Sequence, residues 1–141
     1  MQQKLISIAI DGPVSAGKST LSDAVAKKLN ILHLDTGAMY RAVGLCALMK
    51  GISPEDEQAV VDMCLQGNAQ VDVRYNNQKQ QTMLNGQDVS QDIRTEEVGL
   101  AASTVSRYPK VRSYLVERQQ AIASETSILM DGRDIGTVVL P

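Results

Sequence analysis

The sequence lacks long hydrophobic runs, an excess of positive charge and a cysteine-rich segment. Its apolar runs, such as residues 5–10 and 128–130, are far shorter than the roughly 20 residues that span a bilayer, and its start does not resemble a secretory signal. The 14 basic side chains stand against 16 acidic ones, and the resulting net charge of −2 disfavours a basic face for a nucleic-acid polymer. We therefore expect a cytoplasmic protein that binds no membrane and no nucleic-acid polymer, whereas small anionic ligands fit its charge.

The two cysteines and the single histidine are too few for a metal centre of their own. Cys46 and Cys64 lie far apart, and neither has the paired spacing of zinc ligands. Each stands among apolar neighbours, so we expect two reduced thiols in the core. His33 falls within an expected strand, and we interpret it as structural.

Hydrophobic periodicity predicts an α/β fold. The 141 residues, of which 43% are hydrophobic and 21% charged, have the composition of an ordinary globular domain. Strands that alternate with helices predict a parallel sheet, which binds ligands at the carboxyl ends of its strands. Turn signals at Asn76-Asn77 and Asn85-Gly86 predict a small antiparallel element of three strands. In chain order we expect a strand at 4–10, a helix at 18–29, a strand at 31–34, a helix at 37–49, a helix that opens at Ser53-Pro54-Glu55 with Ser53 as N-cap, three short strands within 69–93, helices at 95–105 and 109–123, and a strand at 127–130.

A phosphate-binding motif follows the first expected strand and precedes the first expected helix. Residues 12–19 match G-x-x-x-x-G-K-[ST] at every fixed position. In such a loop the backbone N–H groups surround a phosphate, Lys18 neutralises the β- and γ-phosphate oxygens, and the Ser19 hydroxyl binds Mg²⁺. Asp131 ends the last expected strand and is a second candidate for Mg²⁺, although Asp131-Gly132 is also typical of a simple turn. The motif predicts a bound nucleoside triphosphate with Mg²⁺, and the predicted nucleotide-binding residues are Gly12, Pro13, Val14, Ser15, Ala16, Gly17, Lys18, Ser19 and Thr20.

Residues after the second expected strand are candidates for a second phosphate site. Asp35 is either a helix cap or a ligand to an acceptor, the Thr36 hydroxyl can point into a cleft, and Arg41 offers a guanidinium fork for a phosphate. Arg112 and Arg133 are further candidates, although a solvated surface position is the default interpretation of each arginine taken alone. A phosphate loop by itself fits a switch, a motor or a kinase. The sequence has no NKxD guanine motif and no DxxG at Asp131, which argues against a GTPase.

Five sequence blocks together resemble the bacterial-type cytidylate kinases, which belong to the nucleoside monophosphate kinases. These blocks are GPVSAGKST, LDTGAMYRA, DVSQDIRTEEV, AASTVSRYPKVR and DGRDIGTVVLP, and they follow one another along the whole chain. The resemblance implies a P-loop kinase with a three-layer α/β/α fold and a small antiparallel insert. It also implies transfer of the γ-phosphoryl group of ATP to CMP or dCMP, which gives CDP or dCDP, by an enzyme that is a monomer at full length.

The resemblance assigns roles to residues that match the family's motifs. Arg41 and Arg133 are implied to hold the acceptor phosphate, and Ser103, Arg112 and Asp134 to read the cytosine edge and the sugar hydroxyls. Lys18 and Arg133 are the implied catalytic residues. The implied acceptor-binding residues are Asp35, Thr36, Arg41, Ser103, Arg112, Arg133 and Asp134.

The resemblance also divides the chain. It implies a core with the phosphate loop at 1–36, a monophosphate-binding region at 37–106 with the strand insert at about 69–93, and a return to the core at 107–141. Family members continue past the VVLP strand into an arginine-rich lid and final core elements, so we expect a C-terminally truncated chain with impaired turnover. Two alternatives stay open, namely another small-acceptor kinase, such as a relative of shikimate or adenylate kinase, and a non-catalytic nucleotide-binding module.

Overall fold

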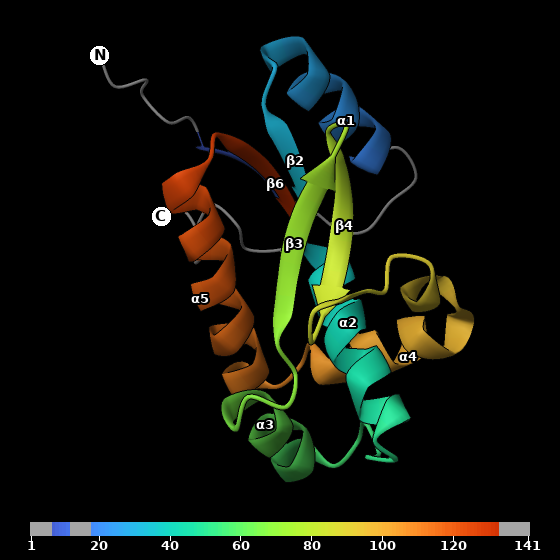
Figure 1. Cartoon of the computed structure of the whole chain (residues 1–141). Helices are drawn as coiled ribbons and strands as arrows, with labels where there is room; N and C mark the ends of the chain where they lie inside the picture. The colour runs from blue at the N-terminus through green and yellow to red at the C-terminus, as the bar shows by residue number, and fades with distance from the viewer. Residues whose placement is uncertain (1–6, 12–17, 133–141) are drawn as a thin grey trace. The chain divides into compact units, whose positions relative to one another are not determined.

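The computed structural model describes residues 7–11 and 18–132 (Figure 1), with the side chains at 10–11, 18–22 and 131–132 left undescribed. The chain divides into two units, one formed by Met1–Thr36 with Val116–Pro141 and the other by Gly37–Leu115. The described elements, in chain order, are β1 (Ser7–Asp11), α1 (Lys18–Leu29), β2 (Leu32–Asp35), α2 (Thr36–Met49), α3 (Glu57–Leu65), β3 (Val71–Asn76), β4 (Lys79–Leu84), β5 (Gln87–Asp88), a 3-10 turn η1 (Asp92–Arg94), α4 (Glu96–Val105), α5 (Pro109–Glu125) and β6 (Ile128–Gly132).

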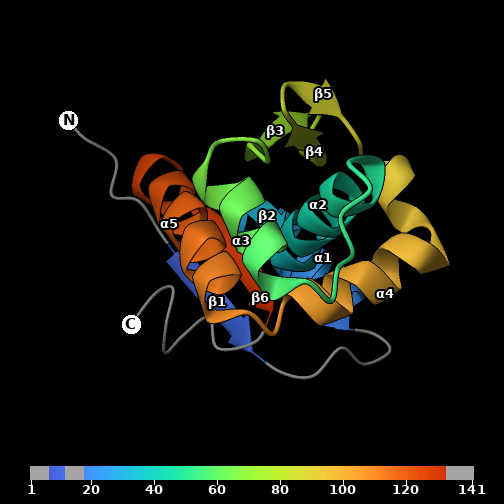
Figure 2. The same ribbon diagram turned by 90° about the horizontal axis from the view of Figure 1, so that it is seen from below.

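The first unit contains the predicted parallel sheet. Its strand order is β1-β6-β2, so the last described strand lies between the first two (Figure 2). Ile128, Leu129 and Met130 of β6 are completely buried, which explains why this strand is an uninterrupted apolar run. Helix α1 connects β1 to β2 and packs against β6 and β2, with Ala26 buried and Leu29, at the end of the helix, half exposed. The prediction of alternating strands and helices with a parallel sheet is confirmed.

The second unit contains the predicted three-stranded insert, an antiparallel sheet of order β3-β4-β5. Its second turn lies at Asn85-Gly86, as predicted, with φ angles of 51° and 82°. Its first turn lies at Asn77-Gln78, with φ angles of 52° and 65°, one residue later than predicted. The reason is that Asn76 still pairs with Lys79 in the sheet, so the two central residues with positive φ, typical of tight hairpin turns, come after it.

Helix α3 begins later than the sequence suggested. We expected Ser53 to cap a helix that opens at Pro54, but the N-cap is Asp56, whose carboxylate accepts a hydrogen bond from the N–H of Ala59 at 3.2 Å. Ser53 instead closes a turn, in which its hydroxyl accepts from the N–H of Glu55 at 3.3 Å. Asp56 is the N-cap in place of Ser53 because a carboxylate is a strong cap. With this start, Glu57 also falls in the first helical turn, near the positive end of the helix dipole.

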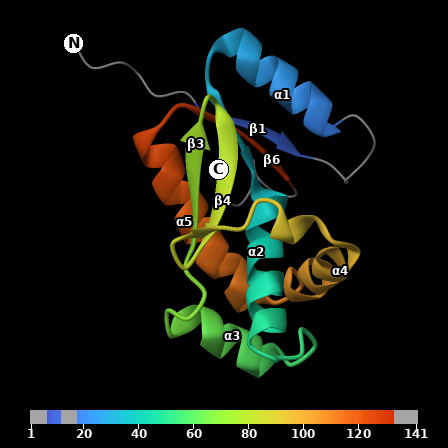
Figure 3. The same ribbon diagram turned by 45° about the vertical axis from the view of Figure 1, so that its right-hand side comes forward.

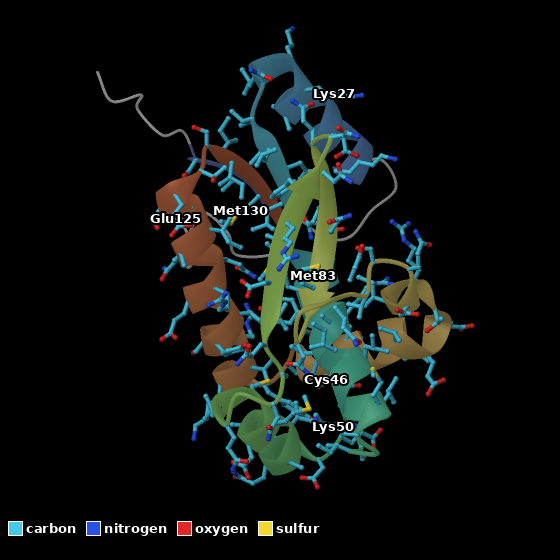
Figure 4. All side chains as sticks on the ribbon, viewed as in Figure 1. Lys27, Cys46, Lys50, Met83, Glu125 and Met130 are labelled. Carbon is cyan, nitrogen blue, oxygen red and sulfur yellow. The ribbon has the colours of Figure 1, made fainter. Side chains whose placement is uncertain are left out.

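Both cysteines are buried and unpaired, as predicted. The thiol of Cys46 donates to the carbonyl of Asn68 at 3.4 Å. Burial, with a smaller contribution from Cys46, raises the pKa of Cys64 to about 11. Burial also raises the pKa of Cys46, against the opposing charge of Lys50, which lies four residues later, just past the end of α2 (Figure 4).

The described residues offer neither a membrane span nor a metal cluster. Within residues 7–11 and 18–132, no helix has the length and apolar character that crossing a membrane requires. Among the side chains that the structure describes, no group of three or more histidine, cysteine or acidic residues has the arrangement of a metal site.

Candidate functional site

The phosphate-binding motif stands between a strand and a helix. Strand β1 ends at Asp11 and α1 begins at Lys18, so the chain context required for such a loop is present on both sides. The start of α1 supplies backbone N–H groups and the positive end of a helix dipole, which attract phosphate. Lys18, Ser19 and Thr20 form the first turn of α1, and the predicted loop residues from Gly12 to Gly17 lie outside the described part of the chain.

Each strand of the parallel sheet has an acidic residue at the edge where the phosphate motif begins. In the parallel register, Asp131 of β6 pairs with Asp35 of β2, and Gly132 pairs with Asp11 of β1. The strands therefore bring Asp11, Asp35 and Asp131 to one edge, the carboxyl edge at which such sheets bind ligands. Carboxylate oxygens are ligands that Mg²⁺ accepts together with phosphate oxygens and water. Asp35 is exposed at this edge, while the next residue, Thr36, is buried and starts α2.

The structure places His33 against α1. Its ring nitrogen Nδ1 lies 2.5 Å from the Oδ1 atom of Asp23, which connects β2 to the helix. The side chain is mostly buried, with 14% of its surface exposed. This contact agrees with the interpretation of His33 as structural.

In the second unit, Arg41 extends from α2 to α4. Its Nη1 atom donates a hydrogen bond to the carbonyl of Ile93 at 3.1 Å. A Cβ atom placed on Gly99 would lie only 3.6 Å from Nη2 of Arg41, so the guanidinium lies directly on α4 at this glycine. Ser103 follows Gly99 by four residues, on the same face of α4, and is exposed. The structure thus places Arg41 and Ser103, two predicted acceptor residues, on the same side of α4.

Helices α2 and α4 are in close contact, so the Arg41 side chain on α2 is long enough to lie on α4. A Cβ atom on Gly44 would lie 2.9 Å from the backbone nitrogen of Ala102 and 3.1 Å from the Cβ atom of Ala101. The two helices therefore meet through small residues, and Figure 3 shows them side by side. Because Arg41 and Gly44 are three residues apart on α2, both face α4.

The remaining predicted acceptor residues are Arg112, Arg133 and Asp134. Arg112 is partly buried on α5, one turn after Tyr108, whose hydroxyl donates to the carbonyl of Pro54 at 2.7 Å. Arg133 and Asp134 lie outside the described residues.

Two partners of Arg41 were not predicted from the sequence. The carbonyl of Ile93 is a backbone group, and no residue type in the sequence indicates that it accepts a hydrogen bond from Arg41. Gly99, in contrast, carries a signal, because a glycine inside a helix is less favourable than alanine by about 1 kcal/mol and so marks a close approach. That signal could have pointed to the contact between α4 and a neighbouring side chain.

Known proteins that are similar in sequence show the family of the chain. A family model described as cytidylate kinase matches residues 8–141. The chain belongs to the cytidylate kinase family. Its parallel sheet and its separate antiparallel sheet are consistent with the P-loop kinase fold that the resemblance implied.

Curated cytidylate kinases are similar to almost the entire chain. The cytidylate kinase of Geobacillus sp. strain WCH70 is 48% identical over 136 residues, which cover 96% of this chain and 60% of the relative. That of Caldicellulosiruptor bescii is 47% identical over 138 residues, or 98% of this chain and 60% of the relative. That of Oceanobacillus iheyensis is 43% identical over 141 residues, which cover 100% of this chain and 60% of the relative. The chain thus spans 60% of the length of these relatives.

Proposed function

We propose that the chain carries the donor and acceptor sites of a kinase that transfers the γ-phosphoryl group of ATP to CMP or dCMP, giving ADP and CDP or dCDP. The observation that carries the proposal is the placement of the phosphate motif between β1 and α1, at the edge where Asp35 and Asp131 pair. Membership of the cytidylate kinase family supports a cytidine monophosphate as the acceptor.

The residues at the donor site fit ATP with Mg²⁺. The start of α1 offers backbone N–H groups to phosphates, and Lys18 would neutralise the β- and γ-phosphate oxygens. Ser19 would hold the Mg²⁺, with Asp131 at the neighbouring strand end as a second ligand. When bound, Mg²⁺ supplies positive charge between the phosphates. The protein's own contribution is to fix the triphosphate so that its terminal group faces the acceptor.

The acceptor side would use Arg41 and Arg133 on the phosphate of CMP. A guanidinium binds two phosphate oxygens at once and stays charged at every physiological pH, so it orients the acceptor and balances its charge. Ser103, Arg112 and Asp134 would read the cytosine edge and the sugar, with Asp35 at the end of β2 and Thr36 at the start of α2. Catalysis then consists mainly of holding two anions in line, with Lys18 and Arg133 beside the transferring group.

We further propose a role for each of the two units, and the partners and cellular location of the enzyme. The unit Gly37–Leu115, which contains Arg41, Ser103 and Arg112, would be the acceptor-binding region, and the parallel sheet with the phosphate motif would be the core. The partners would be small nucleotides, and the enzyme would act as a cytoplasmic monomer.

The test is an ADP-release assay with Mg·ATP and one of four acceptors, CMP, dCMP, UMP or AMP. It uses the 141-residue chain and a lengthened chain, in which a relative's lid segment follows Pro141. We expect the lengthened chain to release ADP with CMP or dCMP in preference to the other two acceptors. In that chain Lys18→Met should abolish turnover, whereas Lys27→Met, at an exposed position of the same helix, should not change it (Figure 4).

The same assay distinguishes the alternatives. Preference for an acceptor other than CMP or dCMP would favour a different small-acceptor kinase. Binding of ATP and CMP by the lengthened chain without release of ADP would favour a non-catalytic binding module. Either outcome refutes the proposed reaction.

A further inference from the structure

We infer that the strand insert and α4 position Arg41 for the acceptor phosphate, through the carbonyl of Ile93 and the missing side chain of Gly99. The inference rests on the proposed function, in which Arg41 binds that phosphate. It makes Ile93 and Gly99 positioning residues, because they act through Arg41 and do not themselves contact the acceptor.

The contacts fix the guanidinium from two sides. Its Nη1 atom donates to the carbonyl of Ile93 at 3.1 Å. The Nη2, Cζ and Nη1 atoms lie 3.6, 3.8 and 3.8 Å from the place where a Cβ on Gly99 would stand. A guanidinium has five N–H donors in a plane, so one bond to a carbonyl orients the plane and leaves other donors for a phosphate.

The carbonyl of Ile93 is itself held by the insert. The Ile93 side chain is buried, and its N–H donates to the carbonyl of Val89 at 3.1 Å. The neighbouring Arg94 donates through Nε to the carbonyl of Ser90 at 3.1 Å. Ser90 in turn accepts, through its hydroxyl, from the N–H of Thr82 in β4 at 2.9 Å. A continuous series of contacts therefore runs from the antiparallel sheet to Arg41, which gives the insert a role in acceptor binding.

Gly99 leaves room for the guanidinium, whose place a side chain larger than that of alanine would occupy. Alanine would make an ordinary contact with Arg41, since its Cβ atom would stand 3.6 Å from Nη2. Valine adds two further carbon atoms at the same point and would displace the guanidinium from the Ile93 carbonyl. Binding would then have to immobilise a side chain with many rotamers, and affinity would fall by about tenfold.

The experiment compares CMP with cytidine, which lacks the phosphate. Calorimetric titration of the 141-residue chain measures both affinities for Gly99→Val, for Gly99→Ala and for the control Leu100→Val, which places valine at an exposed neighbouring position of α4. We expect Gly99→Val to lower the affinity for CMP by about tenfold and the affinity for cytidine by less than about twofold. Gly99→Ala should have a smaller effect on CMP, and Leu100→Val should change neither affinity.

A double-mutant cycle isolates the route through the guanidinium. Arg41→Lys removes the guanidinium. Adding Gly99→Val to that variant should therefore not lower the affinity for CMP any further, whereas two independent effects would add. Should Gly99→Val not fold by circular dichroism, Ile93→Ala loosens the same carbonyl from the other side and should show the same selective loss of CMP binding.

The results of these titrations distinguish a failure of the inference from a failure of the proposed function on which it rests. Failure of the unchanged chain to bind CMP would overturn the proposed function and this inference with it. Normal binding of CMP by the unchanged chain, with equal losses of CMP and cytidine in Gly99→Val or additive losses with Arg41→Lys, would overturn the inference alone.

Discussion

The contact between α2 and α4 at Gly44 gives a quantitative prediction for Gly44→Ala. The added Cβ would lie 2.9 Å from the backbone nitrogen of Ala102 and 3.2 Å from the carbonyl carbon of Ala101. Real Cβ atoms essentially never approach other atoms within 3.0 Å, and the neighbour is backbone, which cannot rotate away as a side chain does. The helices must therefore move apart.

Two opposing effects set the magnitude. Overpacking of a close contact costs about 1–3 kcal/mol, and the backbone clash places Gly44→Ala in the upper half of that range. Alanine is a better helix former than glycine and returns about 1 kcal/mol. We therefore expect the free energy of unfolding to fall by about 1–2 kcal/mol.

Urea unfolding followed by circular dichroism measures this change. The matched control is Gly99→Ala, also inside a helix, whose new Cβ makes only an ordinary contact at 3.6 Å and should keep the gain in helix propensity. We expect Gly44→Ala to unfold at lower urea and Gly99→Ala at equal or higher urea, with similar slopes. A Gly44→Ala chain as stable as the unchanged one would refute the reasoning, because it would mean that α2 and α4 are not in close contact.

Three further predictions concern other parts of the described structure. Because burial raises the pKa of Cys64 to about 11, only about one thiol in a thousand is ionised at pH 8, and both cysteines should react with a thiol reagent only after denaturation; a fast reaction in the folded chain would contradict this. Hydrogen bonds from the hydroxyl and then the N–H of Ser90 lower the pKa of Asp88, so its contribution to stability is present above the ordinary aspartate pKa of about 4 and is lost as the pH falls through the lower folded value. Asp88→Asn should therefore flatten the acid limb of a plot of stability against pH, and an unchanged limb would show that the bonds to Ser90 contribute nothing. Tyr108→Phe removes the hydroxyl that donates to the carbonyl of Pro54 at 2.7 Å and should lower the free energy of unfolding by about 1 kcal/mol at neutral pH. Burial and nearby acidic residues raise the Tyr108 pKa, so this difference should persist below about pH 10 and vanish as the pH rises through the folded value, which urea titrations at several pH values would measure.

The sequence predicted those features that depend on neighbouring residues. The apolar run at 128–130 indicated a buried strand, and Asn85-Gly86 indicated a tight turn because both residues tolerate positive φ. Where several nearby polar residues suited the same N-cap position, the predicted helix start was wrong by a few residues. Ser53 and Asp56 both suit an N-cap, and only the packed structure selects Asp56.

The candidate site divides in the same way. The phosphate motif is contiguous, so its strand and helix could be predicted directly. Pairing of Asp35 with Asp131, in contrast, depends on the order of strands in the sheet, which periodicity does not specify. The bond from Arg41 to the carbonyl of Ile93 joins residues 52 positions apart and involves no characteristic side chain. The roles of all the predicted site residues stay predictions, and Arg133 and Asp134 also lie outside the described residues.

The central place of β6 has a consequence for how the chain folds. Ser7 pairs with Ile128, a separation of 128 − 7 = 121 positions, and neither β1 nor β2 has the other as a neighbour in the sheet. During synthesis the first two strands stay without their sheet neighbour until the last described strand has emerged. The residues from Gly37 to Leu115 are continuous in sequence, and their hairpins and helices can form meanwhile. Because distant pairings form slowly, we expect the parallel sheet to be the late and rate-limiting part of folding.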